Sequence, residues 1–283
     1  MRRVCFYHAG CPDGFGAAWA VWRAWGDRAS YVPRGHDDLI HVSRYGGAHV
    51  VFVDIATDNR TLSALGETVE RLVVLDHHVS AQRRFEDDPA LSSRLRARGH
   101  LVHFDLSHSG AVLAWEHFHG DLGPPDLLRY VEDQDLWRSA LPGSDAVSAA
   151  IASHPRTFES WDALARRPVE QLAAEGEPIL RANRVEIERT LRNAHPIRLG
   201  DLRLEAVNAV HLRSHVGHEL ALRATFGTPC GVVYRILGAR VDVSLYSIGD
   251  VDVAEMAAKL GGGGHRNAAG FSVTLADWLA RFV

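Results

Sequence analysis

The chain has 283 residues, of which 46% are hydrophobic and 23% charged, and its formal net charge is −4. This composition is that of a globular protein with enough apolar material for one large core or two smaller ones. It argues against a long nucleic-acid duplex as the main partner, because neutralising a phosphate backbone requires stripes of basic side chains.

Membrane and secretory signals are not apparent. No window has the length of uncharged apolar sequence that a membrane span needs, and the first ten residues lack a secretory pattern. Cys5, Cys11 and Cys230 form neither an even nor a closely spaced set, which favours a reducing compartment. We therefore expect a cytoplasmic protein with no membrane partner.

In chain order, the first half alternates strand-like and helix-like segments. Strands are predicted at residues 3–8, 29–33, 49–55, 71–78 and 100–106, and helices at 13–25, 61–70 and 109–118. Such alternation is typical of a parallel sheet with helices on both faces.

The pattern becomes helical from about residue 124 to 195. A long helix rich in charged residues is predicted over 167–194, and we interpret it as a linker. Strand signals return at 203–207, 230–237, 239–247 and 271–275, with a helix at 252–260 and a glycine loop at 261–271. We predict an α/β protein with a large domain over residues 1–190, a smaller α/β domain with a mixed sheet over 196–283, and an active cleft between them.

Polar side chains stand where the predicted strands of the first domain end. His8, Asp54 and the run Asp76-His77-His78 each follow an apolar strand. Ligands of parallel sheets bind beyond the carboxyl ends of the strands, where residues distant in sequence meet. Two adjacent histidines after an acid are costly to bury without partners, which favours a functional role for this run.

Two further segments add candidate ligands, each with a structural alternative. His8, Cys11 and Asp13 share one strand-to-helix turn, although Asp13 has an alternative role as a helix N-cap. Glu132, Asp133 and Asp135 crowd a short segment that could also be a solvated face. Asp54 could likewise be only a turn residue.

Together these side chains match the ligands of hard divalent ions, which prefer oxygen and accept imidazole. Two such ions can clamp a phosphoryl group and supply hydroxide for in-line attack. One carboxylate should bridge the ions, and we choose Asp54.

These four segments, in this order, resemble the DHH phosphoesterase superfamily, and the sequence GGGGHRNAAGF at 261–271 is similar to the signature of the DHH-associated C-terminal domain. The family includes nanoRNases, phosphatases of 3′-phosphoadenosine 5′-phosphate, cyclic-dinucleotide phosphodiesterases and single-strand exonucleases. The resemblance implies that His8 and Asp54 hold one metal ion. It implies that the second ion is held by Asp13, Asp54, His77 and Asp133.

The resemblance also implies roles around the metals. Asp76 would orient its neighbours, and His78 would contact the scissile phosphate as an electrophile or acid. The glycine loop and its histidine would grip the substrate phosphate, with Arg266 as the nearest guanidinium. Those loop residues are Gly262, Gly263, Gly264 and His265. Alternatively, such a loop is a flexible connection.

Two positions depart from the family pattern. Many relatives have an aspartate where this chain has Cys11, which is either a thiolate ligand or a lost ligand. A thiolate would favour iron, cobalt or zinc over magnesium. Many relatives have an arginine at the position of Tyr246, which can stack on a base but brings no charge.

The leading hypothesis is a nanoRNase-type phosphodiesterase that hydrolyses very short oligonucleotides to mononucleotides with two ions. Mn²⁺ is the first choice, with Mg²⁺, Co²⁺ or Fe²⁺ as alternatives. Other hypotheses are a phosphomonoesterase on 3′-phosphoadenosine 5′-phosphate-like nucleotides, a cyclic (di)nucleotide phosphodiesterase, and a non-catalytic nucleotide-binding module. The sequence leaves open whether Asp133 or Asp135 is the ligand, and it leaves the oligomeric state open while allowing a homodimer.

Overall fold

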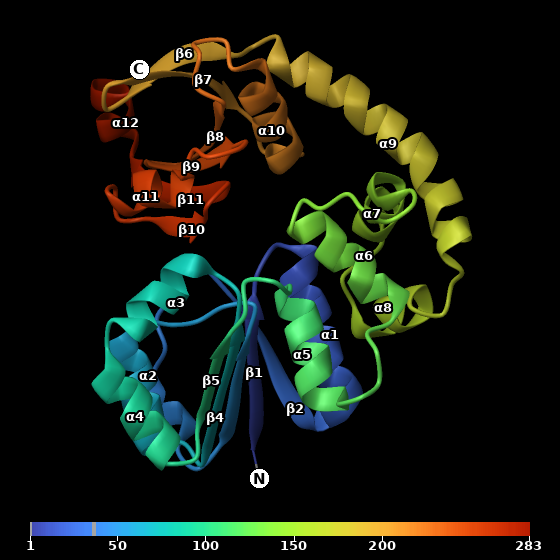
Figure 1. Ribbon diagram of the computed structural model, residues 1–283, viewed down its shortest axis with the longest axis vertical. Helices are drawn as coiled ribbons and strands as arrows, with labels where there is room; N and C mark the ends of the chain where they lie inside the picture. The colour runs from blue at the N-terminus through green and yellow to red at the C-terminus, as the bar shows by residue number, and fades with distance from the viewer. Residues whose placement is uncertain (1, 36–37) are drawn as a thin grey trace. The chain divides into compact units, whose positions relative to one another are not determined.

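The structure is a computed structural model that describes residues 2–35 and 38–283 (Figure 1). The chain forms two compact units, one ending at Leu180 and the other beginning at Arg181. Among the described residues, no helix combines the length and apolar character needed to cross a bilayer.

The first unit is built on a five-stranded parallel sheet with the strand order β2-β1-β3-β4-β5. Its strands are β1 (Arg3–His8), β2 (Ala29–Arg34), β3 (His49–Val53), β4 (Arg71–Asp76) and β5 (Leu101–Phe104). Its helices are α1 (Pro12–Trp25), α2 (Asn59–Thr68), α3 (Val79–Glu86), α4 (Pro89–Ala97), α5 (Gly110–His119), α6 (Asp126–Asp135), α7 (Ser144–Ser153) and α8 (Phe158–Leu164), with 3₁₀ turns η1 (Gly26–Arg28) and η2 (Val42–Tyr45).

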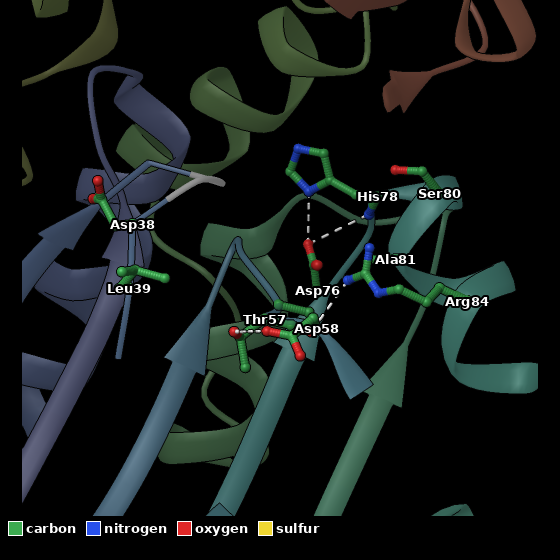
Figure 2. Close-up of a pocket in the computed structure, with 10 residues that line it drawn as sticks. Asp38, Leu39, Thr57, Asp58, Asp76, His78, Ser80, Ala81 and Arg84 are labelled. Carbon is green, nitrogen blue, oxygen red and sulfur yellow. Dashed lines mark hydrogen bonds and ion pairs between the residues drawn. The ribbon is translucent and has the colours of Figure 1, made fainter. Parts of the chain in front are cut away.

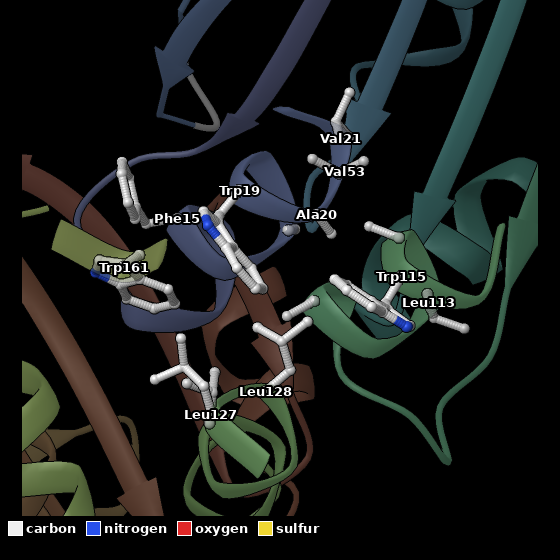
Figure 3. Close-up of a cluster of buried hydrophobic side chains, with 14 of the residues drawn as sticks. Phe15, Trp19, Ala20, Val21, Val53, Leu113, Trp115, Leu127, Leu128 and Trp161 are labelled. Carbon is white, nitrogen blue, oxygen red and sulfur yellow. The ribbon is translucent and has the colours of Figure 1, made fainter. Parts of the chain in front are cut away.

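Helices cover both faces of this sheet because its strands are apolar on both sides. Alternate residues such as Cys5, Val51 and Leu75 face one core. This core includes Trp19 and Trp161 (Figure 3). The intervening residues face a second core, formed with side chains of α2, α3 and α4. Replacing either buried tryptophan by alanine would cost about 3–5 kcal/mol, because the cavity cannot fully collapse.

The second unit contains a six-stranded mixed sheet with the order β10-β11-β9-β8-β7-β6. Only β7 and β8 pair in parallel; the other described pairs are antiparallel. The strands are β6 (His195–Leu199), β7 (Leu202–Asn208), β8 (Cys230–Leu237), β9 (Arg240–Ser247), β10 (Gly263–His265) and β11 (Ala268–Thr274). The helices are α10 (Arg213–Arg223), α11 (Val253–Ala258) and α12 (Leu275–Arg281).

The boundary between the units falls inside the long helix α9 (Val169–Leu191). Its first part belongs to the first unit, where Leu172 lies in the same core as Trp19. Its last part belongs to the second, where Leu191 packs with Val207 and Leu220. The helix thus occupies the segment for which a helical linker was predicted.

The predicted fold class is confirmed: the protein is α/β, with a five-stranded parallel sheet and a separate mixed sheet. Several elements were not predicted, namely α3, α4, β6, α10, β10 and α12. Most of them are short, and charged residues interrupt the hydrophobic pattern of helices such as α3, as in QRRFE at 82–86. The predicted glycine loop is partly wrong, because Gly263–His265 pair with β11 as a strand.

Candidate metal centre

The polar strand ends of the first unit lie at one edge of the sheet. His8 ends β1, Asp54 directly follows β3, and Asp76 ends β4, and these three strands are neighbours in the sheet. The backbone of Asp54 adopts a φ of 58°, in the left-handed region. A residue other than glycine is strained there, and such strain is common at functional sites.

Asp54 lies between two imidazoles. Its Oδ1 is 2.9 Å from His77 Nε2, and its Oδ2 is 3.3 Å from His8 Nδ1. Burial alone would raise the pKa of Asp54, but the hydrogen bonds from His77 and His8 outweigh it and hold the pKa well below its usual value. Burial opposes protonation of His77, yet the Asp54 hydrogen bond and the surrounding carboxylates raise the pKa of His77 to about 10.

Two more carboxylates approach His77 from the helices. Its Nε2 lies 3.5 Å from Asp13 Oδ2 and 3.6 Å from Asp135 Oδ2. Burial and the charges of Asp54 and Asp135 raise the pKa of Asp13 well above its usual value, and burial also raises that of Asp135. Three carboxylates held this close repel one another, and a divalent cation would relieve that repulsion.

The first turn of α5 holds Asp13 in place. The backbone N–H groups of Gly110 and Ala111 donate to its carboxylate at 2.7 and 3.0 Å. The N-cap of α1 is Cys11, whose sulfur accepts from Gly14 N, so the alternative of Asp13 as N-cap does not hold.

Asp76 positions the histidine run. Its Oδ1 accepts from the backbone N–H groups of His77 and His78 at 2.8 and 3.3 Å, and it lies 2.7 Å from His78 Nδ1. The contact at Nδ1 fixes the direction of the His78 ring. These three contacts are the ones that the predicted orienting role of Asp76 requires.

The side chains fall into two sets whose ligand atoms lie within 4.8 Å of one another. One set is His8, Asp54 and His78; the other is Asp13, His77 and Asp135. Mixed carboxylate and imidazole donors suit divalent ions such as Mn²⁺, Fe²⁺, Co²⁺ and Zn²⁺. The residues present therefore fit a metal centre, with Asp54 contacting members of both sets.

The predicted ligand Asp133 lies elsewhere. Its carboxylate accepts from the backbone N–H groups of Ala140 and Leu141 and from the Ser144 hydroxyl. Residues two apart on α6 point about 200° from each other, so only one of Asp133 and Asp135 can face the cluster. That residue is Asp135, which the sequence left as the alternative.

A pocket of about 180 Å³ lies beside His78 (Figure 2). Arg84 of α3 lines it and donates to the backbone oxygen of Thr57 at 3.1 Å. Sequence reasoning did not identify Arg84 and Ser80, because adjacent arginines on a short helix are typical of a solvent-exposed face. The lining residues are Asp38, Leu39, Ala56, Thr57, Asp58, Asp76, His78, Ser80, Ala81 and Arg84.

In the second unit, the predicted phosphate-binding residues Gly263 and Gly264 lie in β10, which pairs with β11, and Gly262 directly precedes β10. A Cβ on Gly262 would be 2.0 Å from the backbone oxygen of Gly270. Gly264 has a φ of 144°, and a Cβ there would be 2.6 Å from the oxygen of Ala268. Close backbone packing therefore explains both glycines, and the phosphate role of Gly262–Gly264 and His265 stays a prediction.

Arg266 and Tyr246 occupy different surroundings. Arg266 pairs with the exposed Asp250 at 3.1 Å. The ring of Tyr246 packs on Gly217 of α10, where a Cβ would lie 2.0 Å from Tyr246 Cδ2. Arg213 of α10 donates to Ser244 Oγ, two residues from Tyr246 on the same strand. A guanidinium thus reaches this strand from a helix, which the sequence did not reveal.

Residues 203–283 match the DHHA1 domain family. An uncharacterized protein of Acanthamoeba polyphaga mimivirus is 26% identical over 290 aligned positions, which cover 95% of this chain and 67% of that protein.

Among solved structures, the chain is similar to the pGpG-specific phosphodiesterase PggH of Vibrio cholerae, with a TM-score of 0.46, 11% identity, and coverage of 99% of this chain and 96% of that one. It is also similar to an exopolyphosphatase-related protein of Bacteroides fragilis, with a TM-score of 0.44, 12% identity, and coverage of 96% and 86%.

Proposed function

We propose that the chain is a metal-dependent phosphodiesterase that hydrolyses very short oligonucleotides to mononucleotides. The observation that supports this most strongly is the position of Asp54, which contacts His8 of its own set of candidate ligands and His77 of the other set. The candidate donors form two neighbouring sets, which supports a pair of ions rather than a single one.

Two divalent ions bound here would polarise a phosphoryl group and make hydroxide available at neutral pH. His8 and Asp54 would hold one ion, and Asp13, His77 and Asp135 the other, with Asp54 between them. The chain's own contribution is to bury these groups and fix their directions before substrate arrives. Such preorganisation avoids reorganisation at the moment of reaction.

In this proposal, His78 contacts the phosphoryl group of the substrate. Because Asp76 accepts at its Nδ1, the ring is held in one orientation. The other ring nitrogen would donate to an oxygen of the phosphoryl group, or return a proton to the leaving oxygen. His78 also lines the pocket, so a group bound there lies next to this donor.

The pocket and the second unit would set substrate size. The pocket of about 180 Å³ beside His78 would take part of one nucleotide. The residues proposed to bind substrate in the second unit are Gly262, Gly263, Gly264, His265, Arg266 and Tyr246. Arg213 joins them as a cation that reaches the strand of Tyr246.

The test is a digestion of end-labelled oligonucleotides, from dinucleotides upward, with Mn²⁺ supplied and with the Asp54→Asn variant as control for contaminating nucleases. We expect release of mononucleotides from dimers and trimers, slower cleavage of longer strands, and none by the variant. Survival of dimers and trimers would contradict the nanoRNase proposal.

The product distinguishes this proposal from its alternatives. Release of inorganic phosphate from a 3′-phosphorylated nucleotide would instead indicate a phosphomonoesterase. Tight nucleotide binding with no turnover of any phosphoester would indicate a non-catalytic binding module.

A further inference from the structure

Cys11 differs from the other two cysteines in its surroundings. Cys5 and Cys230 are buried at 0% and 2% exposure, where a thiol behaves as a small apolar side chain. The sulfur of Cys11 instead contacts polar groups: it lies 3.6 Å from His8 Nδ1 and 3.3 Å from Asp54 Oδ2. Since His8 Nδ1 and Asp54 Oδ2 are themselves 3.3 Å apart, the three atoms form a nearly equilateral triangle.

The edges of this triangle match those of a tetrahedral metal site. With metal–sulfur, metal–nitrogen and metal–oxygen bonds of the usual lengths, neighbouring ligand atoms at the tetrahedral angle are about 3.3–3.6 Å apart. Neighbouring oxygens around octahedral Mg²⁺ are closer, at about 3 Å. The three side chains therefore already have the spacing that a thiolate-ligated ion requires.

Local structure directs the sulfur into this position. Cys11 is the N-cap of α1, and its Sγ accepts from Gly14 N at 3.2 Å. A Cβ on Gly14 would lie 2.1 Å from the backbone oxygen of His8, so glycine allows the first turn of α1 to approach the end of β1. Serine, threonine, aspartate and asparagine are the favoured N-caps, so capping alone is a weak reason for a cysteine here.

In the metal-free protein, burial and the charges of Asp54 and Asp13 raise the pKa of the Cys11 thiol well above its usual value. A bound divalent ion would displace the thiol proton, because a thiol that coordinates a metal is deprotonated. Three protein ligands with an open position are the pattern of catalytic zinc sites.

We propose that Cys11 binds a metal ion as a thiolate together with His8 and Asp54, resting on the proposed function for the presence of the ions. On binding, the thiol proton passes to solvent and a sulfur–metal bond forms. This site would prefer Zn²⁺, Fe²⁺ or Co²⁺, whereas Asp13, His77 and Asp135 offer only oxygen and nitrogen and accept Mn²⁺ or Mg²⁺. The two ions of the pair would then be chemically different.

Cobalt spectroscopy tests the proposal without relying on activity. Co²⁺ is titrated into metal-free protein, and the near-ultraviolet sulfur-to-cobalt charge-transfer band is recorded with the bound metal measured by elemental analysis. We expect the band in the wild type and its loss in both Cys11→Ser and Cys11→Asp, although both variants still bind cobalt. The matched control Cys230→Ala should keep the band.

The outcomes separate this inference from the proposed function. A band without turnover of any phosphoester would leave the thiolate site standing while the phosphodiesterase proposal fails. Conversely, if the protein hydrolyses a phosphoester with Mn²⁺ but binds cobalt without this band, the phosphodiesterase proposal stands and the thiolate inference fails. A band that persists in Cys11→Ser, or a protein that binds no cobalt, would overturn the inference and leave Cys11 as a helix cap.

Discussion

At the scale of single residues, the site depends on carboxylates that are buried away from water. Asp13 and Asp54 are each 1% exposed, and both lie within 3.5 Å of the same imidazole nitrogen. In the metal-free protein, His77 supplies the compensating positive charge, which is why its pKa rises to about 10. In the proposed function, the same arrangement would bind a metal ion once this proton leaves.

Asp135 and Asp133 allow a direct test of which acid is the ligand. We expect Asp135→Asn to weaken metal binding and to lower turnover by about 10²-fold or more, because it removes a charge that faces the cluster. Asp133→Asn should instead lower the free energy of unfolding by about 1–3 kcal/mol, because it disturbs buried hydrogen bonds to Ala140, Leu141 and Ser144. Calorimetric metal titration and denaturant unfolding separate the two effects. Equal metal affinity in Asp135→Asn and wild type would contradict the assignment.

The pKa of His77 predicts how metal-free stability changes with pH. The pKa of a histidine in the unfolded chain is about 6.5, whereas the pKa of His77 in the folded protein is about 10. The folded state therefore binds the proton more tightly. Stability from this group is fully present below about pH 6.5 and is lost as pH rises towards 10. Denaturant unfolding in chelator should show this decline, and His77→Gln should flatten it. A wild-type profile that is level over this range would show that His77 is not protonated in the folded protein.

At the scale of elements, helix α5 is as important to the site as the strands. Its first two N–H groups bind Asp13, and its first residue, Gly110, packs directly on Asp54. Helix N-termini favour anions through unpaired N–H groups and the helix dipole. Sequence reasoning identified this helix but assigned it no part in the site.

Gly110→Ala tests this contact. A Cβ at residue 110 would lie 2.4 Å from Asp54 Cβ and 2.7 Å from its Cα, so either α5 or Asp54 must move. We expect a loss of about 1–3 kcal/mol in the free energy of unfolding, together with weaker metal binding. Gly123→Ala is the matched control, since a Cβ there meets no atom within 4 Å. If Gly110→Ala bound metal as tightly as the control, α5 would not be positioning Asp54.

At the scale of the whole molecule, the proposed ligands all come from one of the two units. His8, Asp54, Asp135 and their neighbours lie before Leu180, and the DHHA1 match lies after Arg181. In the proposed function, the first unit carries the metal ligands and the second unit carries further residues proposed to bind substrate. Each has its own sheet and its own core.

This division predicts where metal stabilises the chain. An ion that binds only the folded state at about 100 times its dissociation constant adds about 2.7 kcal/mol of stability. Hydrogen exchange with and without chelator should show this added protection in β1, β3, β4 and the first turn of α5. Protection that rises to the same extent in β7–β9 would contradict a centre confined to the first unit.

The sequence by itself determined the fold class and brought most of the candidate site to attention. Alternating strands and helices imply a parallel sheet, and such a sheet gathers strand ends at one edge, so His8, Asp54 and the run at 76–78 could be grouped without coordinates. Only the tertiary structure decided between Asp133 and Asp135, because both lie on one helix and its rotation is set by packing. It alone placed Arg84 by the pocket, Arg213 by Tyr246, and the sulfur of Cys11 against His8 and Asp54. Side-chain direction depends on contacts between segments distant in the chain, which periodicity and motif spacing do not record.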